Sequence, residues 1–357
     1  MTQTFREALS TRDNALNFVR LLLATAVIVA HALPMNGFGD PLTLLGIWAV
    51  NGFFAISGYL IAGSRMRLTM RPFMVNRALR IFPAFWVCLV AIAAVFAPVS
   101  ALLSGSKYEI TDAIRYVAVN FGLWIHQKGI AETITTLPIP DQWNSPFWTL
   151  IYEFCAYICA ALLLSLAIAK KRPLLVVSIA FAAVLVLQLA SYGPLDLLYK
   201  PYLQGVRLAG FFLAGMLVYF AGSRWRPSWW LIVGSALLLA LMLVTGLADT
   251  AGQLPAAILL LGLGARLPVR LGAKNDISYG MYIWAWPLQQ LLVLLGLPAL
   301  GPYGAIALSI AVTIPVAWAS WKYIEEPAMR LRKRLGTSAG PRRRENPPRV
   351  SDTSSGA

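Results

Sequence analysis

The sequence predicts an all-α protein, a polytopic membrane helix bundle of about ten transmembrane helices. Hydrophobic residues make up 58% of its 357 residues, and charged residues make up only 13%. A soluble domain carries roughly 25% charged residues. Leucine-, alanine- and valine-rich stretches recur along most of the chain, and they are too long and continuous to be barrel strands. Composition therefore excludes an ordinary soluble domain.

The apolar stretches define the expected spans in order. The stretch at 251–265 is short, which is also typical of a re-entrant segment. The longest connection, 101–146, follows the third span, and within it 111–125 is expected to form a short interfacial helix. The expected spans are 15–35, 42–63, 81–100, 147–168, 173–191, 203–221, 229–247, 251–265, 277–297 and 301–321.

The distribution of basic residues predicts the topology. With the N-terminus inside, the inward-facing segments carry 24 of the 30 lysines and arginines, and the outward-facing segments carry four. Basic residues concentrate in the cytoplasmic loops of membrane proteins. We therefore expect both termini in the cytoplasm and a multi-pass protein of the plasma (inner) membrane. This placement explains the net charge of +15, so we expect no nucleic-acid partner.

One membrane domain, 1–331, is expected to precede a disordered basic cytoplasmic tail, 332–357. The tail from Gly336 is rich in Pro, Ser, Gly and Arg, a composition typical of disorder. Its arginine run at 342–344 suits anionic membrane lipids. We expect neither a cleavable signal peptide nor a separate soluble domain.

Arg20 and His31 bracket the first span, LNFVRLLLATAVIVAHALP, with ten residues between them. A helix rises about 1.5 Å per residue, so they lie about 16 Å apart along it. Charged groups in a span are costly and usually serve a polar cavity. Neutral imidazole accepts a proton near neutral pH, so His31 is a candidate base for a hydroxyl arriving from outside. Helix packing by His31, and pairing of Arg20 with Asp13 or a lipid phosphate, are the alternatives.

Two further groups of residues have the chemistry of a site. Arg77 and Arg80 share one helical face at the cytoplasmic start of the third span and suit phosphate oxygens, although arginines there also set topology. Glu153, inside the fourth span, needs a partner, a proton or water. It is a candidate to orient His31, to bind a sugar hydroxyl or to pair with an arginine.

Aromatic residues accompany these groups. Trp143 and Trp148 flank Glu153 and are candidates for stacking on a sugar ring, or for a place in the interfacial belt. Tyr279, Tyr282 and Trp286 line a cavity or belong to that belt. Glu325, beside several arginines, is expected to form a salt bridge.

Three cysteines complete the candidates, and they lie in apolar helices. Cys155 and Cys159 share a helix face, but no His or third Cys completes a metal-ligand spacing. We expect Cys88, Cys155 and Cys159 to pack in the core, and we expect no metal.

Six segments, in order, resemble the acyltransferase type-three family of integral membrane proteins, which O-acetylate surface polysaccharides and related acceptors. The likeness begins with Arg20 and His31 and runs to about residue 331. GFFAISGYLI resembles the second-helix motif, RALRIFPAFW the Arg-x-x-Arg-Ile-x-Pro motif, and WTLIYE the Trp-Ser/Thr-Leu-x-x-Glu motif. ISYGMYIWAWP and YIEEP resemble the closing pair.

The resemblance implies transfer of an acyl group, expected to be acetyl, from cytoplasmic acyl-CoA (acetyl-CoA) to a hydroxyl of a surface polysaccharide or lipid-linked glycan. It implies that His31 is the base and Glu153 a required active-site carboxylate. Arg20, Arg77 and Arg80 are then donor-side residues that contact coenzyme A. We expect Ser57, Trp148 and Tyr282 to contact substrate, direct transfer without a covalent intermediate, and membrane lipids as further partners.

Two rival interpretations remain open. A transporter or flippase of a glycolipid or small polar solute would use Arg20, His31 and Glu153 as a proton relay. An acyltransferase with a cytoplasmic acceptor, such as a macrolide, keeps the enzyme class and reverses the acceptor side. One departure bears on the site: many family members have histidine where this sequence has Ala285, which would move a second histidine's role, with His126 as the candidate.

Overall fold

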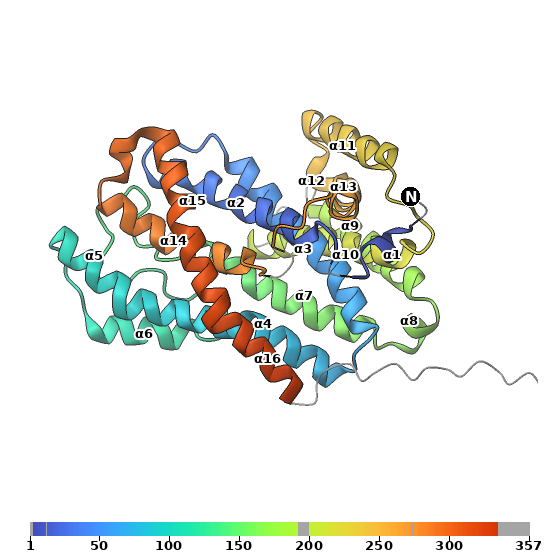
Figure 1. Ribbon diagram of the computed structural model, residues 1–357, viewed down its shortest axis with the longest axis horizontal. Helices are drawn as coiled ribbons and strands as arrows, with labels where there is room; N and C mark the ends of the chain where they lie inside the picture. The colour runs from blue at the N-terminus through green and yellow to red at the C-terminus, as the bar shows by residue number, and fades with distance from the viewer. Residues whose placement is uncertain (1–2, 12, 192–199, 273–274, 335–357) are drawn as a thin grey trace, which may run out of the picture.

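The computed structural model describes residues 3–11, 13–191, 200–272 and 275–334, and in these ranges every regular element is helical. The chain forms a bundle, elongated in the view of Figure 1. The longer helices are α2 (Leu16–Met35), α3 (Thr43–Arg65), α4 (Met70–Ala91), α6 (Ile110–Asn120), α7 (Trp148–Leu163), α9 (Pro173–Ser191), α10 (Lys200–Ala221), α11 (Trp229–Val244), α13 (Gln253–Arg266), α14 (Ser278–Leu294) and α15 (Gly301–Ser320).

Shorter helices complete the described chain. Two are π-helical turns, η1 (Ile92–Phe96) and η4 (Trp321–Glu325), which continue α4 into α5 and α15 into α16. Such wide turns inside helices are frequent at functional sites. The others are α1 (Phe5–Ala8), α5 (Ala97–Ser104), η2 (Ser145–Phe147), α8 (Ala167–Lys171), α12 (Ala248–Ala251), η3 (Leu297–Leu300) and α16 (Glu326–Arg334).

The predicted fold class, a polytopic helical membrane protein, is confirmed. A helix lies at each expected span of the described chain, and seven helical stretches are long and apolar enough to cross a membrane. Helices α11, α13 and α14 are shorter, so ten spans and cytoplasmic termini stay predictions. Backbone groups in these helices bond internally, as hydrocarbon requires.

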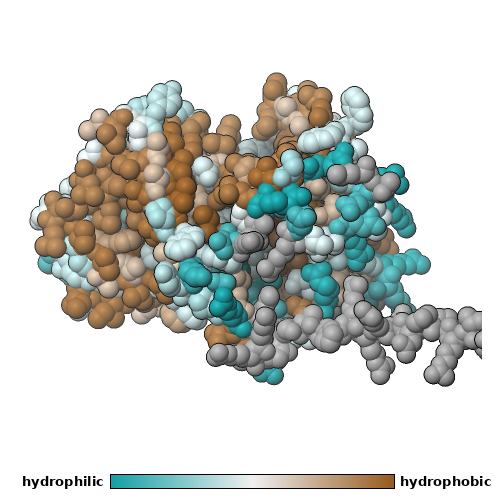
Figure 2. Space-filling model, viewed as in Figure 1, coloured by the Kyte–Doolittle hydropathy of each residue, from teal (hydrophilic) through white to brown (hydrophobic). Residues whose placement is uncertain are grey.

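The two ends of the molecule differ in the elements that they carry. Helices α5 and α6 and the connection between α14 and α15 lie at one end, whereas α1 and α8 lie at the other (Figure 1). Hydrophobic side chains dominate the first end, and hydrophilic side chains gather toward the second (Figure 2). Segments predicted to lie outside and segments predicted to be cytoplasmic are thus found at opposite ends of the molecule.

Three details differ from the sequence predictions. The third span begins earlier, because the helix is continuous from Met70 to Ser104. Helix α16 ends at Arg334, three residues inside the range predicted as tail, and 335–357 lie outside the described residues. Cys88 is buried, but Cys155 and Cys159 are exposed, so their predicted core packing is wrong. Their face of α7 borders a surface groove instead of the helix bundle.

Close contact between α3 and α10 fixes the centre of the bundle. A Cβ atom on Gly58 would lie 1.8 Å from the carbonyl oxygen of Phe212, and one on Gly215 would lie 1.9 Å from that of Ala55. Helices in membranes approach closely where both present small residues. This contact places Ser57, beside Gly58, at a fixed depth in the bundle.

Replacing Gly58 with alanine is therefore expected to destabilise the protein by about 1–3 kcal/mol, because α3 and α10 must move apart to admit the methyl group. Thermal unfolding of the detergent-purified variant measures this. Gly234→Ala is the matched control, since Gly234 is an exposed helical glycine with no atom within 4 Å of an added Cβ. Equal unfolding temperatures for the two variants would contradict the packing argument.

Candidate active site

A cavity of ≈ 90 Å³ lies inside the bundle between α2, α3, α4, α7 and α14. That volume holds several water molecules, since one water needs roughly 10–15 Å³ on this measure. Six of the eight sequence-predicted site residues line it, and His31 and Trp148 do not. The six are Arg20, Ser57, Arg77, Arg80, Glu153 and Tyr282.

Two hydroxyl groups hold the carboxylate of Glu153. Tyr157 donates a hydrogen bond to its Oε1 at 2.5 Å, and Ser57 donates one to the same oxygen at 3.2 Å. Tyr157 lies one turn after Glu153 on α7, where i and i+4 side chains meet. Glu153 forms no ion pair with the described residues, so neither pairing with an arginine nor direct contact with His31 is seen.

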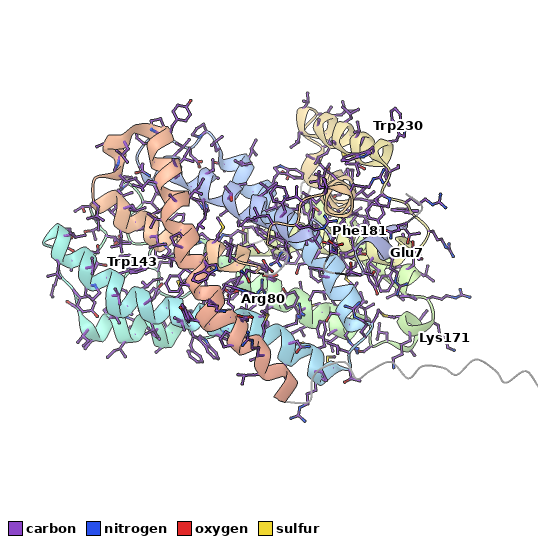
Figure 3. All side chains as sticks on the ribbon, viewed as in Figure 1. Glu7, Arg80, Trp143, Lys171, Phe181 and Trp230 are labelled. Atoms are coloured by element: carbon purple, nitrogen blue, oxygen red, sulfur yellow. The ribbon has the colours of Figure 1, made fainter. Side chains whose placement is uncertain are left out.

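Arg20 and Arg80 belong to an ion-pair network around Asp276. Both guanidinium groups bind Asp276 Oδ2, Arg80 at 2.7 Å, and Arg80 also reaches Glu325 Oε2 at 3.2 Å. The predicted salt bridge of Glu325 is thus confirmed. The predicted alternative of an Arg20–Asp13 pair is wrong, because Asp13 pairs with Arg270. Figure 3 shows Arg80 within the bundle.

Asp276 is the functional candidate that sequence reasoning missed. It stands directly before the ISYGMY segment and is the only acidic residue between positions 250 and 324. An isolated acidic residue directly before this motif was the signal that could have identified Asp276 from the sequence. Its side chain is 14% exposed, and it joins α2, α4 and the start of α14 on one carboxylate.

The protonation of Asp276 follows from its two arginine partners. Burial would raise the pKa of this carboxyl, but the charges of Arg20 and Arg80 outweigh burial and hold the pKa at about 2. Folding therefore gains stability from the ionised carboxylate above its ordinary pKa of 3.8. The gain is lost as the pH falls through about 2.

Asp276→Asn is expected to lower stability at pH 7 by about 3–5 kcal/mol, because two buried guanidinium groups lose their shared partner. The difference from the wild type should shrink as the pH falls from about 4 toward 2, where the native carboxyl also becomes neutral. Thermal unfolding of both proteins over a pH series measures it. A difference that stays constant or grows in acid would contradict this assignment.

Arg77 is the arginine of the cavity without an anionic partner. Within the described part of the chain its guanidinium forms no ion pair, and its buried Nε has no hydrogen-bond partner. It lies 5.9 Å from the centre of the Tyr157 ring and 6.0 Å from that of Phe73. A buried guanidinium held by rings and left without an anion is suited to bind one.

A second cavity, of ≈ 280 Å³, lies against the first. The two share Leu60, Arg77 and Arg80 in their linings, and the second also includes Asn14 and Asn76. These residues come from the N-terminal segment and the start of α4, which are predicted to be cytoplasmic. Arg77 and Arg80 therefore lie between a cavity at that end of the molecule and the cavity of Glu153. We call the second cavity the vestibule.

His31 lies outside both cavities, toward the other end of α2. Its ring meets the ring of Trp286 edge to face at 5.0 Å. The side chain is half-buried, and no hydrogen bond joins it to the described residues. An imidazole fixed by a ring contact, with its nitrogens free, remains able to accept a proton from a ligand.

Tyr282 lies between the cavity and the part of the bundle that contains His31. Its hydroxyl lies 2.5 Å from Thr149 Oγ1 and donates to the carbonyl of Pro146 at 2.5 Å. It is one turn before Trp286 on α14, and its ring lies 6.3 Å from that of Phe53. Cavity and His31 are thus on opposite sides of an aromatic layer.

The remaining candidates lie elsewhere. Trp143 is fully buried and donates its indole N–H to Thr133 at 3.0 Å, so its predicted sugar-stacking role is wrong. Figure 3 shows it toward the end that carries α5 and α6. Ala285 is buried in a small apolar cluster, and the candidate replacement His126 is exposed and lines neither cavity. In the described residues no cluster of three potential metal ligands occurs.

Comparison with known proteins identifies the class. Residues 13–322 match the family model described as "Acyltransferase domain". The chain therefore belongs to this family, the membrane acyltransferases of type three, and the family predicted from the six segments is confirmed. It is an acyltransferase.

Two characterised relatives span almost the same length. "Nodulation protein 10" of Rhizobium leguminosarum bv. viciae is 25% identical over 363 residues, covering 91% of this chain and 96% of the relative. "O-acetyl transferase" of Shigella phage Sf6 is 27% identical over 328 residues, covering 88% and 96%. No solved structure matches the chain.

Proposed function

We propose that this acyltransferase moves an acetyl group from cytoplasmic acetyl-CoA to a hydroxyl of a surface polysaccharide or lipid-linked glycan. The observation that carries the proposal is the buried, unpaired guanidinium of Arg77, set between the vestibule and the cavity of Glu153. The relative named O-acetyl transferase supports the acetyl group and the oxygen acceptor. The plasma (inner) membrane is the proposed location, with membrane lipids around the bundle.

The donor enters from the vestibule in this proposal. Phosphate groups of coenzyme A bind in the vestibule near its boundary with the cavity, where Arg77 supplies a free charge and Arg80 a second, partly neutralised one. The narrow thioester arm then passes Arg77 into the cavity. Guanidinium groups suit this task because their planar donors match phosphate and carbonyl oxygens. Arg20 contributes by holding Asp276, and hence Arg80, in place.

Transfer itself is a direct acyl exchange. The acceptor oxygen attacks the thioester carbonyl carbon, a C–O bond forms and the C–S bond breaks. The proton of the hydroxyl goes to the base and then to the departing sulfur, which leaves as the free thiol of coenzyme A. We assign His31 as the base on the acceptor side. Positioning both reactants supplies much of the remaining acceleration.

Glu153 has the complementary role on the donor side. Its Oε1 is engaged by Ser57 and Tyr157, so its charge is fixed at the cavity wall. We propose that it orients the thioester arm through the amide groups of that arm and stabilises the imidazolium that forms at His31. Tyr282, in the layer between them, contacts the acyl group. We propose that Tyr282 moves aside during transfer, so that the hydroxyl activated by His31 reaches the thioester in the cavity.

A transporter would use the same polar residues, so the first experiment separates transport from transfer. Purified protein receives acetyl-CoA with and without a glycan acceptor, and free thiol is measured. We expect thiol release that depends on the acceptor, with one acetyl group gained by the acceptor for each thiol. Solute movement across vesicles without thioester loss would overturn the proposed function.

A further inference from the structure

A second cleft lies on the other side of α7 from the cavity. An outer cleft of ≈ 550 Å³ is lined by aromatic and polar side chains that the acyl-transfer proposal does not use. Trp148 and Tyr152, one turn apart, face this cleft, whereas Thr149 and Glu153 face the cavity. We use the name outer cleft for the space lined by Trp124, Lys128, Asn144, Trp148, Tyr152 and Gln204.

Two polar side chains that line the cleft each have a polar group without a partner among the described residues. Asn144 is 5% exposed, and its Nδ2 donates to the carbonyl of Ile283 at 2.8 Å, but its Oδ1 has no partner. The ammonium group of Lys128 is exposed and pairs with no carboxylate of the described residues. A ligand with a negative charge would pair with the Lys128 ammonium group, whereas Asn144 Oδ1 is enclosed by the protein.

An apolar groove of ≈ 410 Å³ lies beside the cleft. Tyr152 lines both, and its hydroxyl donates to the carbonyl of Pro201 at 2.9 Å. The groove follows α7 from Tyr152 to Leu163 against α9 and α10, a length of about 16 Å at 1.5 Å per residue. Small residues along its walls leave the space open, namely Ala156, Ala160, Ala180, Gly205 and Ala209. It runs into the apolar part of the bundle.

We propose that the outer cleft and this groove together bind an amphiphile, a saccharide joined through phosphate to one long apolar chain. The chain lies in the groove, the phosphate meets Lys128, and the first sugar packs on Trp124 and Trp148. One groove accommodates one chain, and a cleft of this volume exceeds what a phosphate needs. The proposal rests on the proposed function, because such an amphiphile is the acceptor.

A short segment joins the cleft to His31. The N–H of Trp143 donates to the Lys128 carbonyl at 2.9 Å, and the indole N–H of Trp286 donates to the neighbouring Gln142 carbonyl at 2.7 Å. Trp286 in turn contacts the ring of His31. Hydrogen bonds of this segment therefore connect the wall of the outer cleft to the ring that contacts His31.

Photo-crosslinking tests the site without requiring turnover. The probe is a polyprenyl phosphate with a diazirine on its chain, added to the full-length protein in phospholipid nanodiscs and mapped by peptide mass spectrometry. We expect labels on α7, α9 and α10. Ala156→Phe fills the groove and should reduce labelling at least fivefold, as should Lys128→Glu through charge repulsion. Ala182→Phe, at an exposed position of α9 outside the groove, is the matched control and should keep it.

Three outcomes would overturn the proposal. They are equal labelling of Ala156→Phe and the control, equal labelling of Lys128→Glu and the wild type, and full displacement of the probe by an equal amount of phosphatidylglycerol, which would indicate an ordinary lipid site. Failure here with normal acceptor-dependent thiol release leaves the acyl-transfer function standing. Normal labelling without thiol release leaves the binding site and removes that function.

Discussion

Replacing His31 with alanine is expected to lower the turnover number for acetyl transfer by about 10²–10⁴, the usual contribution of a positioned general base. The imidazole is the free proton acceptor beyond the aromatic layer of Tyr282, and its nitrogens have no hydrogen-bond partner among the described residues. The KM for acetyl-CoA should stay unchanged, because His31 lines neither donor cavity. Acceptor-dependent thiol release measures both quantities.

The second histidine provides the control for this experiment. His126 is exposed and lines neither cavity, but its ring lies 6.4 Å from that of Trp124 in the outer cleft, so His126→Ala should retain the wild-type turnover number at saturating acceptor concentration. Both variants should insert in the membrane normally. Wild-type turnover in His31→Ala, together with complete loss in Glu153→Gln, would move the proton acceptor from His31 to Glu153.

Arg77→Ala is expected to raise the KM for acetyl-CoA roughly 10–100-fold, as loss of charge-assisted hydrogen bonds of about 1.5–3 kcal/mol requires. The effect should fall on the donor rather than the acceptor, because Arg77 lines both the vestibule and the cavity. The folded protein should tolerate the change, since the guanidinium has no anionic partner to leave unpaired within the described chain. Initial rates over a range of acetyl-CoA concentrations measure it.

Two further variants test this prediction. Arg77→Lys keeps the charge but loses the planar donor pair, so its KM should lie between those of the wild type and Arg77→Ala. Arg67→Ala removes an exposed arginine outside both cavities and should change nothing. An unchanged donor KM in Arg77→Ala would exclude Arg77 from donor binding.

The helical architecture was predictable because each span is a long apolar run whose signal is local. Sequence motifs also identified six residues that line one cavity, including Arg20 and Glu153. Their chemistry is unusual for a membrane span, so each stands out without knowledge of its partners. The family resemblance then gave these residues a common role.

Partners that depend on tertiary contact were not predictable. Arg20 and Asp276 are 256 positions apart in the sequence. No residue near Asp13 in the sequence indicates that Asp13 pairs with Arg270 instead of Arg20. Tyr157 looks like one more aromatic residue of an apolar helix until its hydroxyl is seen on Glu153. The predicted role of Trp143 was wrong because the sequence does not distinguish a tryptophan at the membrane interface from a buried one.

Sealed vesicles test the central claim most directly, that donor and acceptor meet from opposite sides of the membrane. Labelled acetyl-CoA is supplied only on the face that carries the N-terminus and vestibule, and glycan acceptor only on the other. The account predicts labelled acceptor and equimolar free coenzyme A on their respective sides, both strongly reduced in His31→Ala. Transfer only when both substrates are on the same side would contradict it.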